Sequence, residues 1–376
     1  MEPAEKDFIA KLPKEVRKSY VDGRNAINRQ LKTKYQNERE AIAEPFKKGI
    51  ETERKHRAIL NSCVFPFTET GSLVGTGYRF VRASPLAEYG LPNTDFLLYK
   101  DNNRYRCAIF GECKSSTASA MEVVNQMRDR MAVAEAHRDL IAREYLMEKD
   151  YSSIVFEPVI AAPPADAHQV LNRIIETGGG ITVWSVEMIP GATLSLCEPP
   201  RRDIQIRSID GQDIVVKRAS LLHKDKELVK SLANPVDSNS SAINTFPKTH
   251  RVLEMLALVR VATVGEKGLM VTKERLRDYL KSDLFYMSPA YIDELANRII
   301  EDAMTIKVLE YRSEEHAFRL IASGSNRTSV SLAIEKKWVD HQVEEMYLQE
   351  RDEVLSKLKK EATGKIPRRA TLDPWL

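Results

Sequence analysis

The stretch Leu91–Ser116, which reads LPNTDFLLYKDNNRYRCAIFGECKSS, decides the fold because its pattern is that of a β-hairpin. Thr94–Tyr99 (TDFLLY) and Tyr105–Phe110 (YRCAIF) are two runs rich in apolar and aromatic residues, which favour strands. Asp101–Asn103 (DNN) lies between them and has the residue types of a turn. The stretch therefore predicts two adjacent antiparallel strands.

Three charged residues stand at the open end of this predicted hairpin. Asp95 begins the first run, whereas Glu112 and Lys114 follow the second, two residues apart and so on one face. In a hairpin the start of one strand meets the end of the other, so we expect the three side chains to converge. Paired carboxylates suit Mg²⁺, and a neighbouring lysine can activate a water molecule. The constellation therefore predicts hydrolysis of a phosphodiester.

These residues resemble the active-site motif of the PD-(D/E)XK nuclease superfamily, which includes restriction enzymes, recombination exonucleases and junction resolvases. Asn93–Asp95 stands where that family has Pro-Asp, with the proline displaced to Pro92, and Glu112–Lys114 matches the E-x-K half. The resemblance covers roughly Phe46–Met188, about two fifths of the chain. It implies an α/β fold, with a restriction-endonuclease-like mixed-sheet core flanked by helices.

The resemblance also implies a role for each residue of the motif. Asp95 and Glu112 become metal ligands, Cys113 counts as a further metal-binding position, and Lys114 becomes the group that activates water. The implied cofactor is Mg²⁺, for which Mn²⁺ can substitute. The alternative is a solvated strand end, in which Glu112 and Lys114 form a surface ion pair and Asp95 is a turn residue.

The helix before the hairpin offers a further carboxylate. Pro45 is predicted to start this helix, which extends to about residue 61, and Glu53 falls on its otherwise inward-facing stripe. The resemblance implies that a glutamate of this helix reaches the metal site, with Glu53 as the first candidate and Glu51 as the second. The equally weighted alternative is an ion pair between Glu53 and Arg57, one turn on.

The segments after the hairpin complete an α/β order. Thr117–Leu146 is predicted to be a long helix, and the resemblance implies that its Gln126 orients the site, unless it is a surface amide. Ile154–Ala162 and Ile181–Val186 are continuous apolar runs typical of buried strands, with a helix at His168–Glu176 between them. This order of helices and strands agrees with the motif independently.

Composition restricts the class of protein. The chain has 376 residues, a net charge of +3 and 43% hydrophobic residues, which suffices for two or three packed domains and permits a nucleic-acid partner. No apolar run is long enough to span a membrane, and the N-terminus lacks a signal-peptide core. The cysteines are few and scattered, which predicts reduced thiols and a cytoplasmic location.

Shifts in composition divide the chain into predicted parts. A hairpin is expected around Asp210–Gly211, and the final helix at Leu332–Lys360 is a possible contact with a neighbouring protomer. The predicted parts are a charged helical segment (1–44), the nuclease domain (45–233), a linker (234–247), a winged-helix-like domain (248–325), and a C-terminal helix with a basic tail (326–376).

The winged-helix-like domain rests on three predicted helices followed by two strands. The predicted elements are Leu253–Thr263, a helix capped by Thr272 and ending at Lys281, a helix from Ser288-Pro289 to about Met304, and strands at Lys307–Tyr311 and Ala317–Ile321. The third helix is acidic, which opposes its insertion into a DNA groove. Contact with DNA through other elements and contact with protein are therefore equally weighted.

Together, these features predict a Mg²⁺-dependent DNA endonuclease, with a type II restriction enzyme as the nearest functional type. The expected reaction is in-line attack of water on double-stranded DNA, with Asp95 and Glu112 holding the metal and Lys114 activating the water. Cutting both strands needs two sites, so a homodimer is expected. The alternatives are a repair or recombination nuclease, a junction resolvase of the same fold, and a non-catalytic DNA-binding regulator on a degenerate nuclease scaffold.

Overall fold

The computed structural model describes residues 3–69, 71–102, 106–116, 119–190, 202–208, 225–232, 236–237, 251–265, 268–322, 324 and 326–364. The chain forms two compact units. Met1–Gly49, Thr305–Val308 and Ala322–Leu376 make up what we call the helical unit, and Ile50–Met304 with Leu309–Ile321 make up the sheet unit. The predicted hairpin at residues 210–211, most of the predicted linker and the basic tail beyond residue 364 lie outside the described residues.

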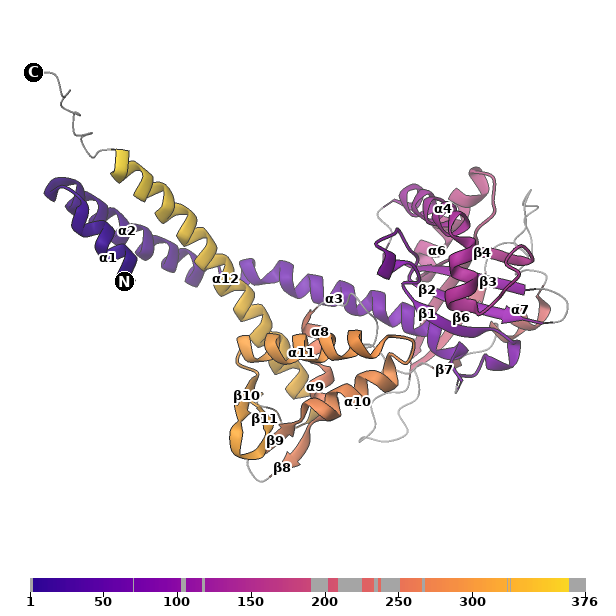
Figure 1. The fold of residues 1–376 in the computed structure, drawn as a ribbon. Helices are drawn as coiled ribbons and strands as arrows, with labels where there is room; N and C mark the ends of the chain where they lie inside the picture. The colour runs from indigo at the N-terminus through magenta and orange to yellow at the C-terminus, as the bar shows by residue number, and fades with distance from the viewer. Residues whose placement is uncertain are drawn as a thin grey trace, which may run out of the picture. The chain divides into compact units, whose positions relative to one another are not determined.

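The sheet unit is built on a mixed sheet, several of whose strands are labelled in Figure 1. The spatial order of the strands follows the chain from β1 to β7. Strand β3 pairs in parallel with β4, and β4 in parallel with β5, whereas all other neighbours are antiparallel. The mixed α/β class predicted from the sequence is therefore confirmed. The strands are β1 (Arg79–Ala83), β2 (Phe96–Asp101), β3 (Arg106–Cys113), β4 (Ile154–Ala162), β5 (Thr182–Pro190), β6 (Arg202–Ser208) and β7 (Val236–Asp237).

Strands β2 and β3 form the predicted hairpin. Their register runs from Phe96 opposite Gly111 to Asp101 opposite Arg106. Gly111 is required by packing, because a Cβ atom at this position would lie 1.8 Å from Cζ of Phe96. The Phe96 ring therefore lies against the bare backbone of the opposite strand, on the face where it also stacks with Trp184.

Helices cover both faces of the sheet. Helices α3 (Arg39–Val64) and α7 (Lys226–Leu232) pack on the face that buries Phe96 and Leu98. Helices α4 (Ala120–Ala136) and α6 (Pro164–Glu176) pack on the opposite face. Successive β2 residues alternate between these two layers, as expected for a strand buried on both sides.

Two predicted helix boundaries are wrong. Pro45 lies inside α3, and the break occurs earlier, at Glu38, which caps α2. A proline inside a helix costs about 3 kcal/mol. The 26-residue helix α3 tolerates Pro45 because it keeps its hydrogen bonds on both sides of that residue. The predicted helix at 117–146 is also divided, because His137 leaves helical geometry between α4 and the short α5 (Arg138–Ile141) and the π-helical turn Ala142–Leu146.

A smaller α+β region lies at the C-terminal side of the sheet unit. Its antiparallel sheet has the order β10-β11-β9-β8. The predicted caps are confirmed, since the Thr272 hydroxyl accepts from Arg275 N–H and the Ser288 hydroxyl from Tyr291 N–H. The elements are α8 (Arg251–Met255), α9 (Ala257–Val261), β8 (Thr263–Gly265), β9 (Gly268–Val271), α10 (Lys273–Asp283), α11 (Pro289–Thr305), β10 (Leu309–Arg312) and β11 (Ala317–Leu320).

This region departs from prediction at its start. The single helix expected at Leu253–Thr263 is instead two short helices, and Thr263 already belongs to strand β8. The hairpin formed by β8 and β9 was not predicted from the sequence. Its strands are short and half exposed, and the apolar run at Leu269–Val271 is too short to indicate a strand by itself.

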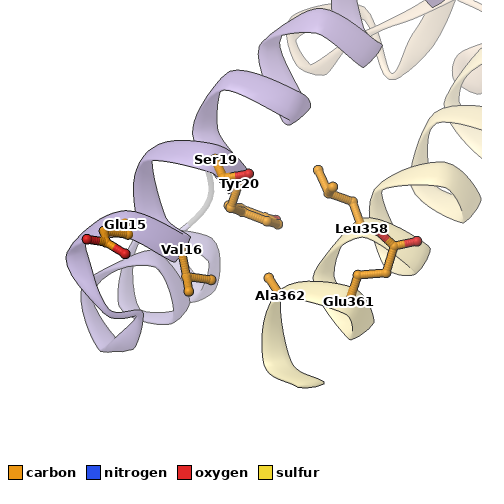
Figure 2. Close-up of a pocket in the computed structure, with 7 residues that line it drawn as sticks. All are labelled: Glu15, Val16, Ser19, Tyr20, Leu358, Glu361 and Ala362. Atoms are coloured by element: carbon orange, nitrogen blue, oxygen red, sulfur yellow. The ribbon is translucent and has the colours of Figure 1, made fainter. Parts of the chain in front are cut away.

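The helical unit contains α1 (Pro3–Lys11), α2 (Lys14–Asn37), the first part of α3, and α12 (Arg327–Gly364). Helix α12 packs along α2 of its own chain. The contact of this helix with a neighbouring protomer stays a prediction. Lys34 and Tyr35 of α2 both donate to Glu350 of α12, at 2.9 Å. A cavity of about 230 Å³ between these helices is lined by Glu15, Val16, Ser19, Tyr20, Leu358, Glu361 and Ala362 (Figure 2).

A buried ion pair closes the turn end of the β2–β3 hairpin. Lys100 Nζ lies 2.7 Å from Asp225 Oδ2, and the two side chains are only 6% and 4% exposed. The other oxygen of Asp225 accepts the Leu228 N–H in the first turn of α7. The pair therefore ties the hairpin to α7. Within the described parts of the chain, no helix has the length and apolar character needed to cross a membrane.

Candidate active site

The predicted convergence at the open end of the hairpin is found in the structure. Asp95 directly precedes β2, and its N–H donates to the Gly111 carbonyl at 2.8 Å, which extends the ladder by one residue. Continuing the register places Asp95 opposite Glu112. Lys114 follows β3, and its N–H donates to the Ala161 carbonyl at the end of the parallel strand β4. The three residues therefore lie at the carboxyl ends of β3 and β4, where α/β sheets commonly bind ligands.

The hairpin itself fixes the Asp95 carboxylate. Its Oδ2 atom accepts the Cys113 N–H at 2.7 Å, and the Nε2 atom of His56, from α3, lies 3.8 Å from the same oxygen. The Asp95 side chain remains 24% exposed. One carboxylate oxygen is thus held by the main chain of the opposite strand, while the group stays accessible to a ligand.

Glu112 is the buried member of the site. Its side chain is 3% exposed, and its two oxygens face two cations. Oε1 lies 2.7 Å from Lys114 Nζ, and Oε2 forms an ion pair with Arg130 of α4. A buried carboxylate is tolerated only with such compensation, because the loss of hydration otherwise costs several kcal/mol.

Lys114 has a second partner, which is the predicted Gln126. Lys114 Nζ donates to Gln126 Oε1 at 2.8 Å, so the amide is a neighbour of the site. Burial lowers the pKa of the Lys114 ammonium, while the charge of Asp95 acts in the opposite direction. A lysine with a lowered pKa gives up its proton more readily, as the predicted role in activating water requires.

The helix carboxylates lie in ion pairs along α3. Glu53 Oε1 accepts from Arg57 Nε at 2.8 Å, which is the alternative that the sequence left open. Glu51 pairs with Lys55, and both of these side chains are 62% exposed. The α3 side chain found beside Asp95 is His56.

Cys113 presents only its main chain to the site. Its thiol is fully buried in the layer beneath α3, beside Cys63, and this burial raises the pKa of the Cys113 thiol. The metal-binding role of Cys113 stays a prediction. Its backbone N–H donates to Asp95 Oδ2, so the main chain is the part of Cys113 that contacts the site.

The donor set fits a hard cation whose coordination shell is completed by substrate and water. Across the described ranges, no group of three or more His, Cys, Asp and Glu side chains could hold a metal ion. The two carboxylates of Asp95 and Glu112 remain. Mg²⁺ is often bound through one or two carboxylates, with waters and substrate phosphate supplying the other oxygens.

The sequence predicts no role for two residues that the structure places at the site, Arg130 and His56. Arg130 lies one helical turn beyond Gln126, so the i, i+4 spacing on one helix face was the signal that could have identified it. His56 adjoins the stripe of α3 that contains Glu53 and Arg57, but nothing in that local pattern points to Asp95. Its contact depends on how α3 packs against the sheet.

The chain was compared with protein-family models, with curated proteins and with solved structures, and none of the three comparisons gave a match. The function of this chain is therefore inferred from its residues and their geometry.

Proposed function

We propose that this chain is a Mg²⁺-dependent DNA endonuclease with a restriction-endonuclease-like core, and that its nearest functional type is a type II restriction enzyme. One observation carries the proposal. Asp95, the Glu112–Lys114 segment and Gln126 come from three different elements and gather at one end of a hairpin. The sheet order and the covering helices give this hairpin the surroundings that the motif requires.

The chemistry follows from the roles that these atoms can fill. Asp95 and Glu112 would hold Mg²⁺, which when bound supplies Lewis-acid stabilisation of charge on the phosphate oxygens. The Lys114 amine is positioned to take a proton from the attacking water, and Gln126 holds the amine in place. Catalysis of phosphoryl transfer depends chiefly on positioning and electrostatics, which a site built on adjoining strands provides.

Duplex DNA is the proposed substrate, and the C-terminal α+β region is proposed as a winged-helix-like domain. Helix α11, which corresponds to the third helix predicted from the sequence, has little basic charge to offer a phosphate backbone. Arg298 donates to the buried Glu254, and on α10 Arg277 pairs with Asp293 of α11. DNA contact through other elements and protein contact both remain compatible with this arrangement. A homodimer would bring two sites to the two strands of DNA.

The test is cleavage of plasmid and phage DNA by the purified protein, with Mg²⁺ and with chelator. Discrete fragments that require metal are expected, and Glu112→Ala should abolish them. Asp129→Asn is the matched control, because Asp129 is an exposed carboxylate of α4 next to Arg130. Equal fragmentation by Glu112→Ala, or fragments in the presence of chelator, would exclude the proposed site.

A non-catalytic DNA-binding scaffold is the second candidate, and one observation favours it. Both oxygens of Glu112 are already engaged by Lys114 and Arg130. Titration with Mn²⁺ separates the two candidates, because a scaffold should bind DNA equally with and without metal. Branched and methylated duplexes in the same assay would distinguish a resolvase or repair nuclease from a restriction enzyme.

A further inference from the structure

Arg130 is the residue of the candidate site whose place the proposed reaction does not explain. Its guanidinium occupies one oxygen of Glu112, a proposed metal ligand. Lys114 occupies the other oxygen, at 2.7 Å. A divalent cation at Glu112 would therefore lie against two positive charges, in a region where burial limits screening by water.

The two cations differ in what they can do when Glu112 is needed elsewhere. Lys114 keeps Gln126 as a partner at 2.8 Å if it leaves the carboxylate. Arg130 stands one turn further along α4, and its side chain is 20% exposed, whereas the Glu112 side chain is 3% exposed. Arg130 can therefore reach toward solvent, and Glu112 cannot follow it.

A phosphate group is the ligand that such a guanidinium would exchange for a carboxylate. The planar fork of arginine matches phosphate and carboxylate equally well, through two parallel hydrogen bonds. The exchange also leaves no uncompensated buried charge, because Lys114 continues to pair with Glu112. Charge thus permits Arg130 to move only when an anion arrives.

We infer that Arg130 is a phosphate-binding residue that masks Glu112 until a DNA phosphate draws it away, so that metal binding at Glu112 and DNA binding are coupled. This inference rests on the proposed function. It gives Arg130 two partners in turn, first the Glu112 carboxylate and then a backbone phosphate of the substrate. Metal affinity without DNA is then held down by the arginine rather than by a lack of ligands.

The test measures metal binding and not cleavage. Mn²⁺ affinity is determined by electron paramagnetic resonance for the wild type and for Arg130→Met, each with and without a short mixed-sequence duplex. The duplex carries phosphorothioate linkages, which retain backbone charge and resist hydrolysis. Arg130→Lys keeps the charge, and Arg128→Met removes the same charge from the same helix at a residue that bonds Thr177 instead.

Arg130→Met without duplex is the decisive measurement, since phosphate oxygens can themselves bind metal in the wild-type complex. We expect this variant to bind Mn²⁺ about tenfold more tightly than the wild type, within the usual range of site-to-site coupling. The duplex should then add less to Mn²⁺ affinity than it adds in the wild type. The variant should also bind the duplex more weakly in the absence of metal. Arg128→Met should retain wild-type Mn²⁺ affinity, and Arg130→Lys should stay close to it.

Two results would overturn the inference in distinguishable ways. Unchanged Mn²⁺ affinity in Arg130→Met, in a protein that still cuts DNA, would refute the masking role and leave the proposed function standing. Failure of every variant to bind Mn²⁺, with or without duplex, would refute both.

Discussion

The two ends of the β2–β3 hairpin both bury charged side chains, but only at the turn end are the carboxylate and its cation both buried. At the turn end, Lys100 and Asp225 form an ion pair whose side chains are only 6% and 4% exposed. At the open end, Glu112 faces both Lys114 and Arg130, whose side chains are 22% and 20% exposed. The first arrangement has no group left to offer a ligand, whereas the second has cations at the surface.

The difference shows how burial separates a structural ion pair from a functional one on the same two strands. A fully enclosed pair gains little net stability over apolar residues, yet it is costly to break. A buried carboxylate with partly exposed cations can exchange partners with an incoming anion or metal. Variants at the two ends should therefore differ in kind, one set affecting cleavage and the other affecting folding.

The largest effect is expected at the open end. Lys114→Ala should lower single-turnover cleavage by about 10³-fold, equivalent to about 4 kcal/mol in the barrier, because it removes the group proposed to activate water. The unfolding midpoint should change little, since Arg130 still compensates Glu112 in the free protein. Cleavage at the wild-type rate, or loss of folding, would refute the assigned role.

The next effect is expected at the turn end, and on stability. Asp225→Ala should lower the free energy of unfolding by about 3 kcal/mol, because the buried Lys100 ammonium would lose the carboxylate that lies 2.7 Å from it. Urea denaturation measures this change, and cleavage per folded molecule should be unaffected. The double variant Lys100→Met/Asp225→Leu should recover most of the loss. A single variant as stable as the wild type would show that the pair is not closed in solution.

A smaller effect is expected for the carboxylates of α3. Glu53→Gln should destabilise the protein by about 2 kcal/mol, because the 3% exposed Arg57 side chain loses the carboxylate that lies 2.8 Å from its Nε atom. Cleavage should fall less than about tenfold if Glu53 belongs to the scaffold, and further if it helps to hold the metal. Glu51→Gln is the matched control, with no measurable change in stability or cleavage, because its ion pair is exposed.

The smallest effect is expected in the wild-type protein, where two thiols report on the two ends. Burial raises the pKa of Cys107, opposite Lys100, to about 12, and it also raises the pKa of Cys113 beside Glu112. Because the thiolate is the reactive form, neither thiol should be alkylated by iodoacetamide at pH 8. Asp225→Ala should expose Cys107 before Cys113, as mass spectrometry of labelled peptides would show. Equal labelling of both thiols would mean that the hairpin opens as one unit.

Local patterns are what made the centre of this fold predictable. Two apolar, aromatic-rich runs and the turn residues between them correctly predicted the hairpin, and the strand period then placed Glu112 and Lys114 on one face. The strand at Ile154–Ala162 was predicted with its observed bounds, because a continuous apolar run between polar segments has few alternatives. Gln126, for which the resemblance implied a place near the site, accepts a hydrogen bond from Lys114, and its role in orienting the site stays a prediction.

Contacts between elements distant in sequence were not predictable. His56 and Arg130 lie on helices, and Asp225 directly precedes one, whose approach to the sheet depends on side-chain packing that one sequence does not specify. The same limit applies to α2 and α12, since neither polar pattern identifies the other helix as its partner. The helix start predicted at Pro45 was wrong for a different reason. One proline was taken to end a helix, although the surrounding residues form a 26-residue helix that contains it.

Gly111 has a consequence for how relatives of this chain could be sought. The close approach of the Phe96 ring leaves no room for a side chain at Gly111, so the residue after Asp95 and the residue before Glu112 constrain each other. A search for aspartate followed by an aromatic residue, and then glycine directly before Glu-x-Lys, joins a packing requirement to a chemical one. Such a signature should identify distant relatives of this chain that a search with Glu-x-Lys alone would not separate from chance matches.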